Sequence, residues 1–80
     1  METEQMLAEI NKIFITVMDN EDIRINAATA AKDIEEWDSL THIQLIVAVE
    51  KHFKIKFTSQ EIRNFNCVGD MCVVIKQKLG

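Results

Sequence analysis

The chain has 80 residues, of which 48% are hydrophobic, and it carries a formal net charge of −4. A chain of this length holds one small domain, and such an apolar composition argues against disorder. The acidic balance disfavours a nucleic-acid partner, because phosphate contacts need clustered lysine and arginine. A basic patch on a partner protein is the more natural counterpart.

Cysteine and histidine are too few and too scattered to suggest a metal centre or a disulfide framework. Cys67 and Cys72 match no recognised zinc spacing, and His42 and His52 lie far from them in sequence. Free thiols indicate a reducing compartment. No secretory signal and no stretch long enough to cross a bilayer is visible. We therefore expect a cytoplasmic monomer without a metal site and without membrane insertion.

The first predicted element is an amphipathic helix over residues 4–18, since apolar residues recur every three or four positions. Thr3 is a plausible cap for this helix. The apolar face comprises Met6, Leu7, Ile10, Ile13, Phe14, Val17 and Met18. The absence of proline and the presence of only two glycines also favour helices joined by polar loops.

A long loop follows, because periodicity weakens over residues 19–37. The acidic cluster at 19–22 should end the first helix. Ile23 and Ile25 flank Arg24 as in an extended piece held to the core by its two isoleucines, and residues 27–32 could form a helical turn. Long loops in small domains are often functional, and this one leads to Ser39.

Three further helices are predicted after the loop. Residues 39–52 form the most apolar run, and residues 54–57 read as an extended connector. Thr58 and Glu61 fit a capping box that opens a short helix, and residues 68–79 form the last helix. The predicted fold is all-α: a small bundle of three main helices and one short helix, with a long loop between the first two.

The junction of Asp38 and Ser39 opens the second helix. Either side chain can cap it, because a short side-chain oxygen accepts a hydrogen bond from an unpaired backbone N–H. The positive end of the helix dipole lies beside the Ser39 hydroxyl and would favour a phosphate attached there. A simple helix cap and a phosphate-attachment site both fit this geometry.

With Asp38-Ser39-Leu40 at this place in the helix order, the chain resembles an acyl carrier protein over nearly its whole length, as a single domain of residues 1–80. Val68-Gly69-Asp70 at the start of the last helix is also similar to the family. The resemblance implies that Ser39 carries 4′-phosphopantetheine, taken from coenzyme A, through a phosphodiester. The arm's thiol would hold acyl groups as thioesters for fatty acid, polyketide or other specialised acyl metabolism, and the protein itself would not be an enzyme.

The resemblance also assigns roles to neighbouring residues. Asp38 would cap the helix and position Ser39 for a phosphopantetheinyl transferase, and Leu40 would pack beside the attachment point. The other implied partners are enzymes that load and transfer acyl groups. The residues expected at the docking surface are Trp37, His42, Ile43, Val47, Glu50 and Arg63. For Trp37, packing against the second helix is the slightly favoured alternative.

Several positions depart from the pattern of carriers that serve fatty acid synthesis. Three sites where acids are common in the second helix hold Thr41, Gln44 and Lys51. Only Glu50 keeps a negative charge in that helix. Ile62 and Phe65 are bulkier than usual and would narrow an acyl pocket between the second and third helices. We therefore expect a specialised carrier for short, polar or unusual acyl groups rather than the housekeeping fatty acid carrier.

Other functions remain open from the sequence. A peptidyl or aminoacyl carrier would use the same attachment site. An unmodified helical interaction module would use Ser39 only as a cap. A hydrolase with Ser39 as nucleophile and His42 as base is disfavoured, because no orienting acid is visible and the chain leaves little room for a cleft.

Overall fold

The computed structural model describes residues 2–79, which form α-helices and one short 3₁₀ helix and contain no strand. The helices are α1 (Thr3–Met18), α2 (Ser39–Phe53), α3 (Ser59–Arg63) and α4 (Val68–Leu79), and the 3₁₀ helix η1 is Ala31–Asp33. This confirms the predicted all-α bundle with one short helix and a long first loop. The ends of the predicted domain, Met1 and Gly80, lie outside the described residues.

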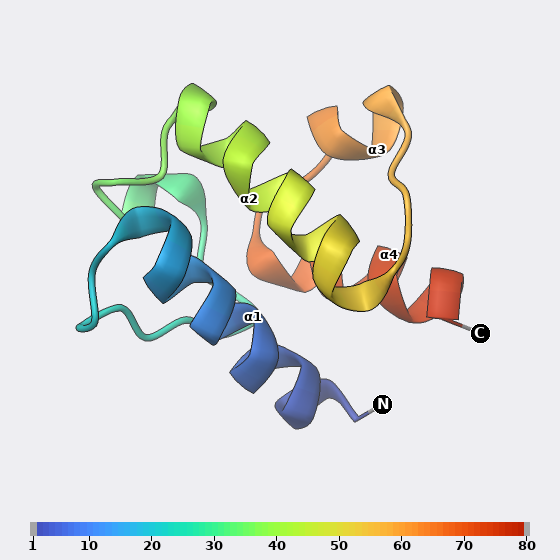
Figure 1. Ribbon diagram of the computed structural model, residues 1–80, viewed down its shortest axis with the longest axis horizontal. Coiled ribbons are helices and arrows are strands. Elements are labelled where there is room, and N and C mark those ends of the chain that lie inside the picture. The colour runs from blue at the N-terminus through green and yellow to red at the C-terminus, as the bar shows by residue number, and fades with distance from the viewer. Residues whose placement is uncertain (1, 80) are drawn as a thin grey trace.

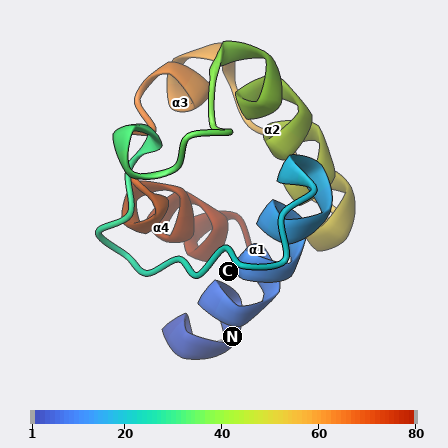
Figure 2. The same ribbon diagram turned by 90° about the vertical axis from the view of Figure 1, so that its left-hand side faces the viewer.

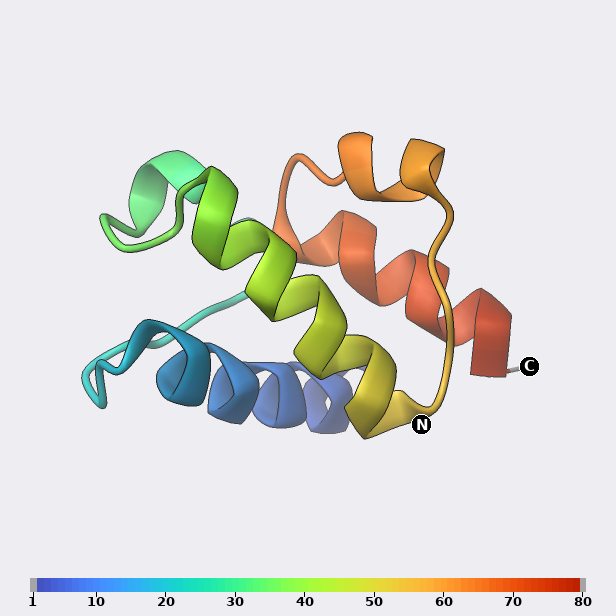
Figure 3. The ribbon, with the colours of Figure 1, turned by 45° about the horizontal axis from the view of Figure 1, so that its top comes forward.

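Helix α2 runs between α1 and the side of the molecule formed by α3 and α4 (Figures 1 and 3). Seen from the end, the helices surround one interior, and the α1–α2 loop passes α4 before it returns to α2 (Figure 2). The largest fully buried side chains are Phe14, Met6, Ile10, Leu45, Met71, Ile75, Val49 and Val68. They come from α1, α2 and α4, so these three helices share one hydrophobic core.

Helix α1 has the predicted apolar face, but it begins differently from the prediction. Thr3 is already helical, and the cap position belongs to Glu2, whose side chain makes no capping bond. The prediction that Thr3 caps the helix is therefore wrong. As predicted, α1 ends where the acidic cluster begins. Asp19, the first residue of the cluster, adopts a left-handed conformation (φ 54°), and its N–H donates to the carbonyl of Ile15.

The extended piece after α1 is tied to that helix by Asn11. The Asn11 amide donates to the carbonyl of Ile23 (3.2 Å) and accepts from the N–H of Ile25 (2.8 Å). Ile23 is buried and Ile25 half-buried, which confirms the predicted attachment of this piece to the core. Asn11 thereby satisfies backbone groups of a segment that belongs to no sheet.

The predicted helical turn over residues 27–32 is displaced, and η1 covers only Ala31–Asp33. Asn26 and Thr29 explain the shift. The Thr29 hydroxyl accepts from the N–H of Asn26 (2.9 Å), and the Asn26 side chain accepts from the N–H of Ala28 (2.8 Å). Such local side-chain bonds compete with helical ones.

The same loop caps α4. The N–H of Val68 donates to the carbonyl of Thr29 (2.8 Å), and the N–H of Gly69 donates to the carbonyl of Ala27 (2.8 Å). Because the first N–H groups of a helix have no partner within it, these carbonyls satisfy donors that a side-chain cap would otherwise take. The loop is thus fastened to α4 as well as to α1.

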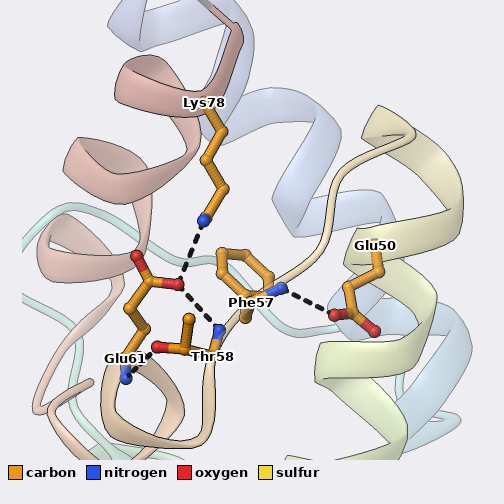
Figure 4. A network of polar contacts seen from close by, with 5 residues as sticks. All are labelled: Glu50, Phe57, Thr58, Glu61 and Lys78. Atoms are coloured by element: carbon orange, nitrogen blue, oxygen red, sulfur yellow. Dashed lines mark hydrogen bonds and ion pairs between the residues drawn. The ribbon is translucent and has the colours of Figure 1, made fainter.

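A polar network fastens α3 to its neighbours (Figure 4). Thr58 and Glu61 form the predicted capping box: the Glu61 carboxylate accepts from the N–H of Thr58 (2.8 Å), and the Thr58 hydroxyl accepts from the N–H of Glu61 (3.1 Å). Lys78 of α4 pairs with the same carboxylate (3.1 Å), and Glu50 of α2 accepts from the N–H of Phe57 (2.8 Å). The short helix is therefore held at both sides.

The close approach of α4 to the loop predicts the effect of Gly69→Ala. A Cβ at this position would lie 2.8 Å from the carbonyl oxygen of Ala27, so backbone must move. Overpacking costs about 1–3 kcal/mol, while alanine gains up to about 1 kcal/mol of helix propensity over glycine. We expect a net loss of about 1–2 kcal/mol in the free energy of unfolding, measured by urea denaturation.

Gln77→Ala is the matched control, because Gln77 is an exposed position of the same helix. It should change the unfolding free energy by no more than about 0.5 kcal/mol. If the Gly69→Ala protein is as stable as the unmodified chain, the loop backbone at Ala27 can move away from α4 without loss of stability.

Candidate functional site

Asp38 caps α2. One oxygen of its carboxylate accepts from the N–H groups of Leu40 (3.0 Å) and Thr41 (3.0 Å). The Thr41 hydroxyl in return accepts from the N–H of Asp38 (2.8 Å). The bond from the Thr41 N–H is the main cause that lowers the pKa of the Asp38 carboxyl from its ordinary value. Asp38, not Ser39, therefore fills the capping position.

Ser39 is consequently left free. It is the first residue of α2 and is exposed. Within residues 2–79 no group forms a hydrogen bond with its hydroxyl. The hydroxyl lies at the positive end of the helix dipole, where an attached phosphate is electrostatically favoured.

Trp37, immediately before the cap, is buried and only 5% exposed. Its ring meets that of Phe14 of α1 edge to face, with centroids 5.0 Å apart. Its Nε1–H donates to Nδ1 of His42 (3.0 Å). Trp37 therefore packs against His42 of the second helix, as the favoured alternative predicted, and also against α1, which was not predicted. Its burial argues against its predicted part in docking.

His42, which was expected at the docking surface, is half-buried. Because Nδ1 accepts from Trp37, the ring proton resides on Nε2, which lies 3.4 Å from the carbonyl oxygen of Ile62. His42 thus links the segment before α2 to α3. With both ring nitrogens engaged, it is not placed to act as a base toward Ser39.

A groove of about 550 Å³ opens beside Ser39, between α2 and α3. From α2 it is lined by Ser39, His42 and Ile43, from α3 and the segment after it by Ile62, Arg63 and Phe65, and otherwise by Ala31, Trp37 and Asp38. The structure thus places four of the residues predicted for docking, Trp37, His42, Ile43 and Arg63, around a hollow next to the candidate attachment site.

Two residues that line the groove, Ile62 and Phe65, are fixed by contacts with neighbouring side chains. Phe65 meets Phe57 edge to face, with centroids 5.2 Å apart, and Ile62 is joined to α2 through His42. The bulky walls leave a shallow hollow at the surface.

A second surface follows α2 away from Ser39. Leu40, Ile43 and Val47 are 69%, 55% and 43% exposed, although each is a large apolar side chain. Their spacing of three and four residues places them along one side of the helix. We call these three residues the α2 stripe. Exposed apolar stripes of this kind commonly mark sites of protein interaction.

The charge beside the α2 stripe is basic. Glu50 is half-buried and its carboxylate already accepts from the N–H of Phe57 (2.8 Å), which limits its predicted part in docking. Lys51, Lys54 and Lys56 follow Val47 along the chain, and with Val47, Glu50 and Ile55 they line a hollow of about 420 Å³. The end of the stripe is therefore apolar and positively charged.

The two cysteines are free thiols. Burial raises the pKa of the Cys72 thiol, so this thiol stays protonated and unreactive at neutral pH. The described part of the chain brings together no group of three or more His, Cys, Asp or Glu side chains that could hold a metal ion.

Comparison with known proteins identifies the family. The chain matches no protein-family model and no curated protein. Among solved structures it is similar to the holo acyl carrier protein from Geobacter metallireducens, with a TM-score of 0.85 and 41% identity over 91% of this chain and 84% of that chain. The chain belongs to the acyl carrier protein family. The resemblance seen in the sequence is confirmed, and with it the helical fold.

Acyl carrier proteins carry acyl groups and are not enzymes, and they work by interacting with acyl-handling enzymes. For this acyl carrier protein, no helix between residues 2 and 79 is both long enough and apolar enough to cross a membrane. The Asp38-Ser39-Leu40 tripeptide, on which the resemblance to this family rested, thus lies at the start of α2.

The cap predicts a specific acid sensitivity. Since the folded state lowers the pKa of Asp38, its carboxylate stabilises the fold at neutral pH, and this contribution is lost as the pH falls below the ordinary value of 3.8. Asp38→Asn keeps a capping oxygen but does not titrate. We expect this variant to lose less stability than the unmodified chain between neutral pH and pH values under 3.8, measured by urea denaturation.

Asp22→Asn serves as the control, because it removes an exposed loop carboxylate without touching the cap. It should leave the acid sensitivity almost unchanged. Equal sensitivity in the unmodified chain and Asp38→Asn would contradict the assignment of Asp38 as the titrating cap.

Proposed function

We propose that this acyl carrier protein holds acyl groups as thioesters on a 4′-phosphopantetheine arm that coenzyme A supplies and Ser39 carries. The observation that supports this most is the free, exposed hydroxyl of Ser39 at the start of a helix already capped by Asp38. The related acyl carrier protein was solved in its holo form. The arm, when bound, supplies the thiol that holds the cargo.

The residues present fit such a group. In the modification, the Ser39 oxygen bonds to the phosphorus next to the pantetheine of coenzyme A, the pyrophosphate bond breaks, and the nucleotide half leaves. Because both nitrogens of His42 are engaged, the proton of Ser39 must go to a base of the phosphopantetheinyl transferase. The cap formed by Asp38 fixes the start of α2, and the dipole of this helix favours the phosphodiester that results.

The chain then acts by presentation. A flexible arm raises the concentration of cargo at a docked enzyme without any chemistry by the carrier. The groove beside Ser39 offers the cargo a shallow resting place with bulky walls at Ile62 and Phe65. These walls support a specialised carrier for short, polar or unusual acyl groups rather than for long chains.

The α2 stripe is the proposed docking surface. Leu40, next to Ser39, is its most exposed residue, and Ile43 and Val47 extend it. Its partners are the transferase and the enzymes that load and transfer acyl groups. Three apolar side chains form a small patch, which suits weak, reversible docking by a single domain of residues 1–80 that works as a monomer. The free thiols support a cytoplasmic location.

The first test is the intact mass after incubation with coenzyme A and a broad-specificity phosphopantetheinyl transferase. We expect the chain to gain one phosphopantetheine and Ser39→Ala to gain none. Because Asp38 is the cap, Ser39→Ala should change the unfolding free energy by no more than about 0.5 kcal/mol. A folded chain that no transferase modifies would leave an unmodified interaction module as the better description.

The docking proposal predicts the effect of Leu40→Ala on the transferase reaction. Truncation of a side chain at the centre of an interface costs about 1 kcal/mol or more, which corresponds to roughly a fivefold fall in kcat/KM, and Leu40 is the most exposed residue of the stripe. The measurement is the rate of phosphopantetheine attachment at limiting carrier concentration. Circular dichroism should show that the variant remains folded, because Leu40 is an exposed residue.

Val73→Ala is the matched control, since Val73 is an exposed apolar residue of α4 with 55% of its surface accessible. It should react at the rate of the unmodified chain. If Leu40→Ala and Val73→Ala react equally fast, the transferase does not dock on the α2 stripe.

A further inference from the structure

We propose that the groove beside Ser39 accepts acyl cargo that ends in a carboxylate, and that Arg63 is the residue that recognises this carboxylate. The proposal rests on the proposed function, because Ser39 must carry the arm. It goes further by naming a chemical class of cargo and the side chain that selects it.

The groove joins the attachment site to Arg63. Ser39 is the first residue of α2, Arg63 is the last residue of α3, and both line the same hollow of about 550 Å³. Ile43 and Ile62 line it too and offer apolar contact. An arm that folds back from Ser39 would lay the methylene groups of a short cargo against these walls and bring its far end toward α3.

Arg63 is the one arginine in the lining of this groove, which contains no lysine, and its guanidinium is always charged. Among residues 2–79 no carboxylate forms an ion pair with it. Its guanidinium therefore keeps all its donors for a ligand. A guanidinium binds a carboxylate through two parallel hydrogen bonds, which gives both strength and orientation.

Apart from Ser39, which would carry the arm, the other polar side chains of the lining already have hydrogen-bond partners, Asp38 through one of its two oxygens. Asp38 accepts from two N–H groups of α2, Trp37 donates to His42, and the remaining nitrogen of His42 faces the carbonyl of Ile62. A neutral cargo would use the same apolar walls but would leave Arg63 to the solvent. The difference in binding between an anionic and a neutral cargo of equal length thus measures the contribution of Arg63.

The network that fastens α3 fixes the helix from which Arg63 projects, although it does not contact the Arg63 side chain. Glu61 is paired with Lys78 at 3.1 Å, and the Lys78 ammonium lies 5.9 Å from the centre of the Phe57 ring. Lys78 of α4, drawn in Figure 4, is therefore paired with an acid of α3. A site organised before the ligand arrives loses less free energy on binding.

The test loads the full chain from glutaryl-coenzyme A and from pentanoyl-coenzyme A, cargoes matched in length that differ in the terminal carboxylate. The readouts are the rate of thioester hydrolysis and the NMR shift of the Arg63 side-chain Nε–H. We expect the glutaryl thioester to be protected about two- to fivefold more than the pentanoyl thioester, the range of a partly exposed ion pair. Added salt should reduce this difference.

Arg63→Gln should abolish the additional protection of the glutaryl thioester while leaving the pentanoyl thioester unchanged. Lys12→Gln, which removes an exposed cation of α1 outside this groove, should preserve the difference. Comparison of the same two cargoes in all three proteins removes the intrinsic difference in their hydrolysis rates.

Three outcomes would overturn the proposal. Equal glutaryl protection in the unmodified chain and Arg63→Gln would show that Arg63 does not bind the carboxylate. An equal effect of Arg63→Gln on both cargoes would show that its anion is the phosphodiester of the arm. Loading on a residue other than Ser39, or no loading at all, would instead refute the proposed function, and the mass spectrum separates that failure from the others.

Discussion

The capping bonds of Asp38 are the constraint on which the candidate site depends. The first N–H groups of α2 need acceptors, and in many helices the residue at the position of Ser39 or just before it supplies them. Here Asp38 accepts from Leu40 and Thr41, and Thr41 returns a bond to the backbone of Asp38. The Ser39 hydroxyl is left free at the positive end of the helix, which is the condition for its proposed use as an attachment point.

A short series of contacts connects the candidate site to the hydrophobic core and fixes its position. Phe14 of α1 packs against Trp37, Trp37 donates to His42, and His42 reaches the carbonyl of Ile62 on α3. The groove is therefore built on the same aromatic packing that holds α1 to the rest of the bundle. A substitution of Trp37 is expected to lower stability and to alter the shape of the groove, because the same ring packs against Phe14 and bonds to His42.

The charge of the whole chain does not describe its functional face. The chain is acidic, with a net charge of −4, yet the only acid of α2 is Glu50, and its carboxylate accepts from the backbone of Phe57. The exposed part of α2 is an apolar stripe followed by Lys51 and Lys54. The surface proposed for docking therefore ends beside positive charge although the whole chain is acidic, and long-range attraction and close contact need not favour the same partner.

Local patterns in the sequence were sufficient for the helices, for the Thr58–Glu61 capping box and for the special place of Asp38-Ser39-Leu40. Each of these depends on residues no more than about one helical turn apart, so their physics is contained in short segments. Tertiary structure decided the rest. It buried Trp37 against Phe14, joined His42 to a carbonyl 20 residues away, and capped α4 with carbonyls of the loop. These contacts arise only when distant segments meet, and no periodicity in the chain encodes which segments those will be.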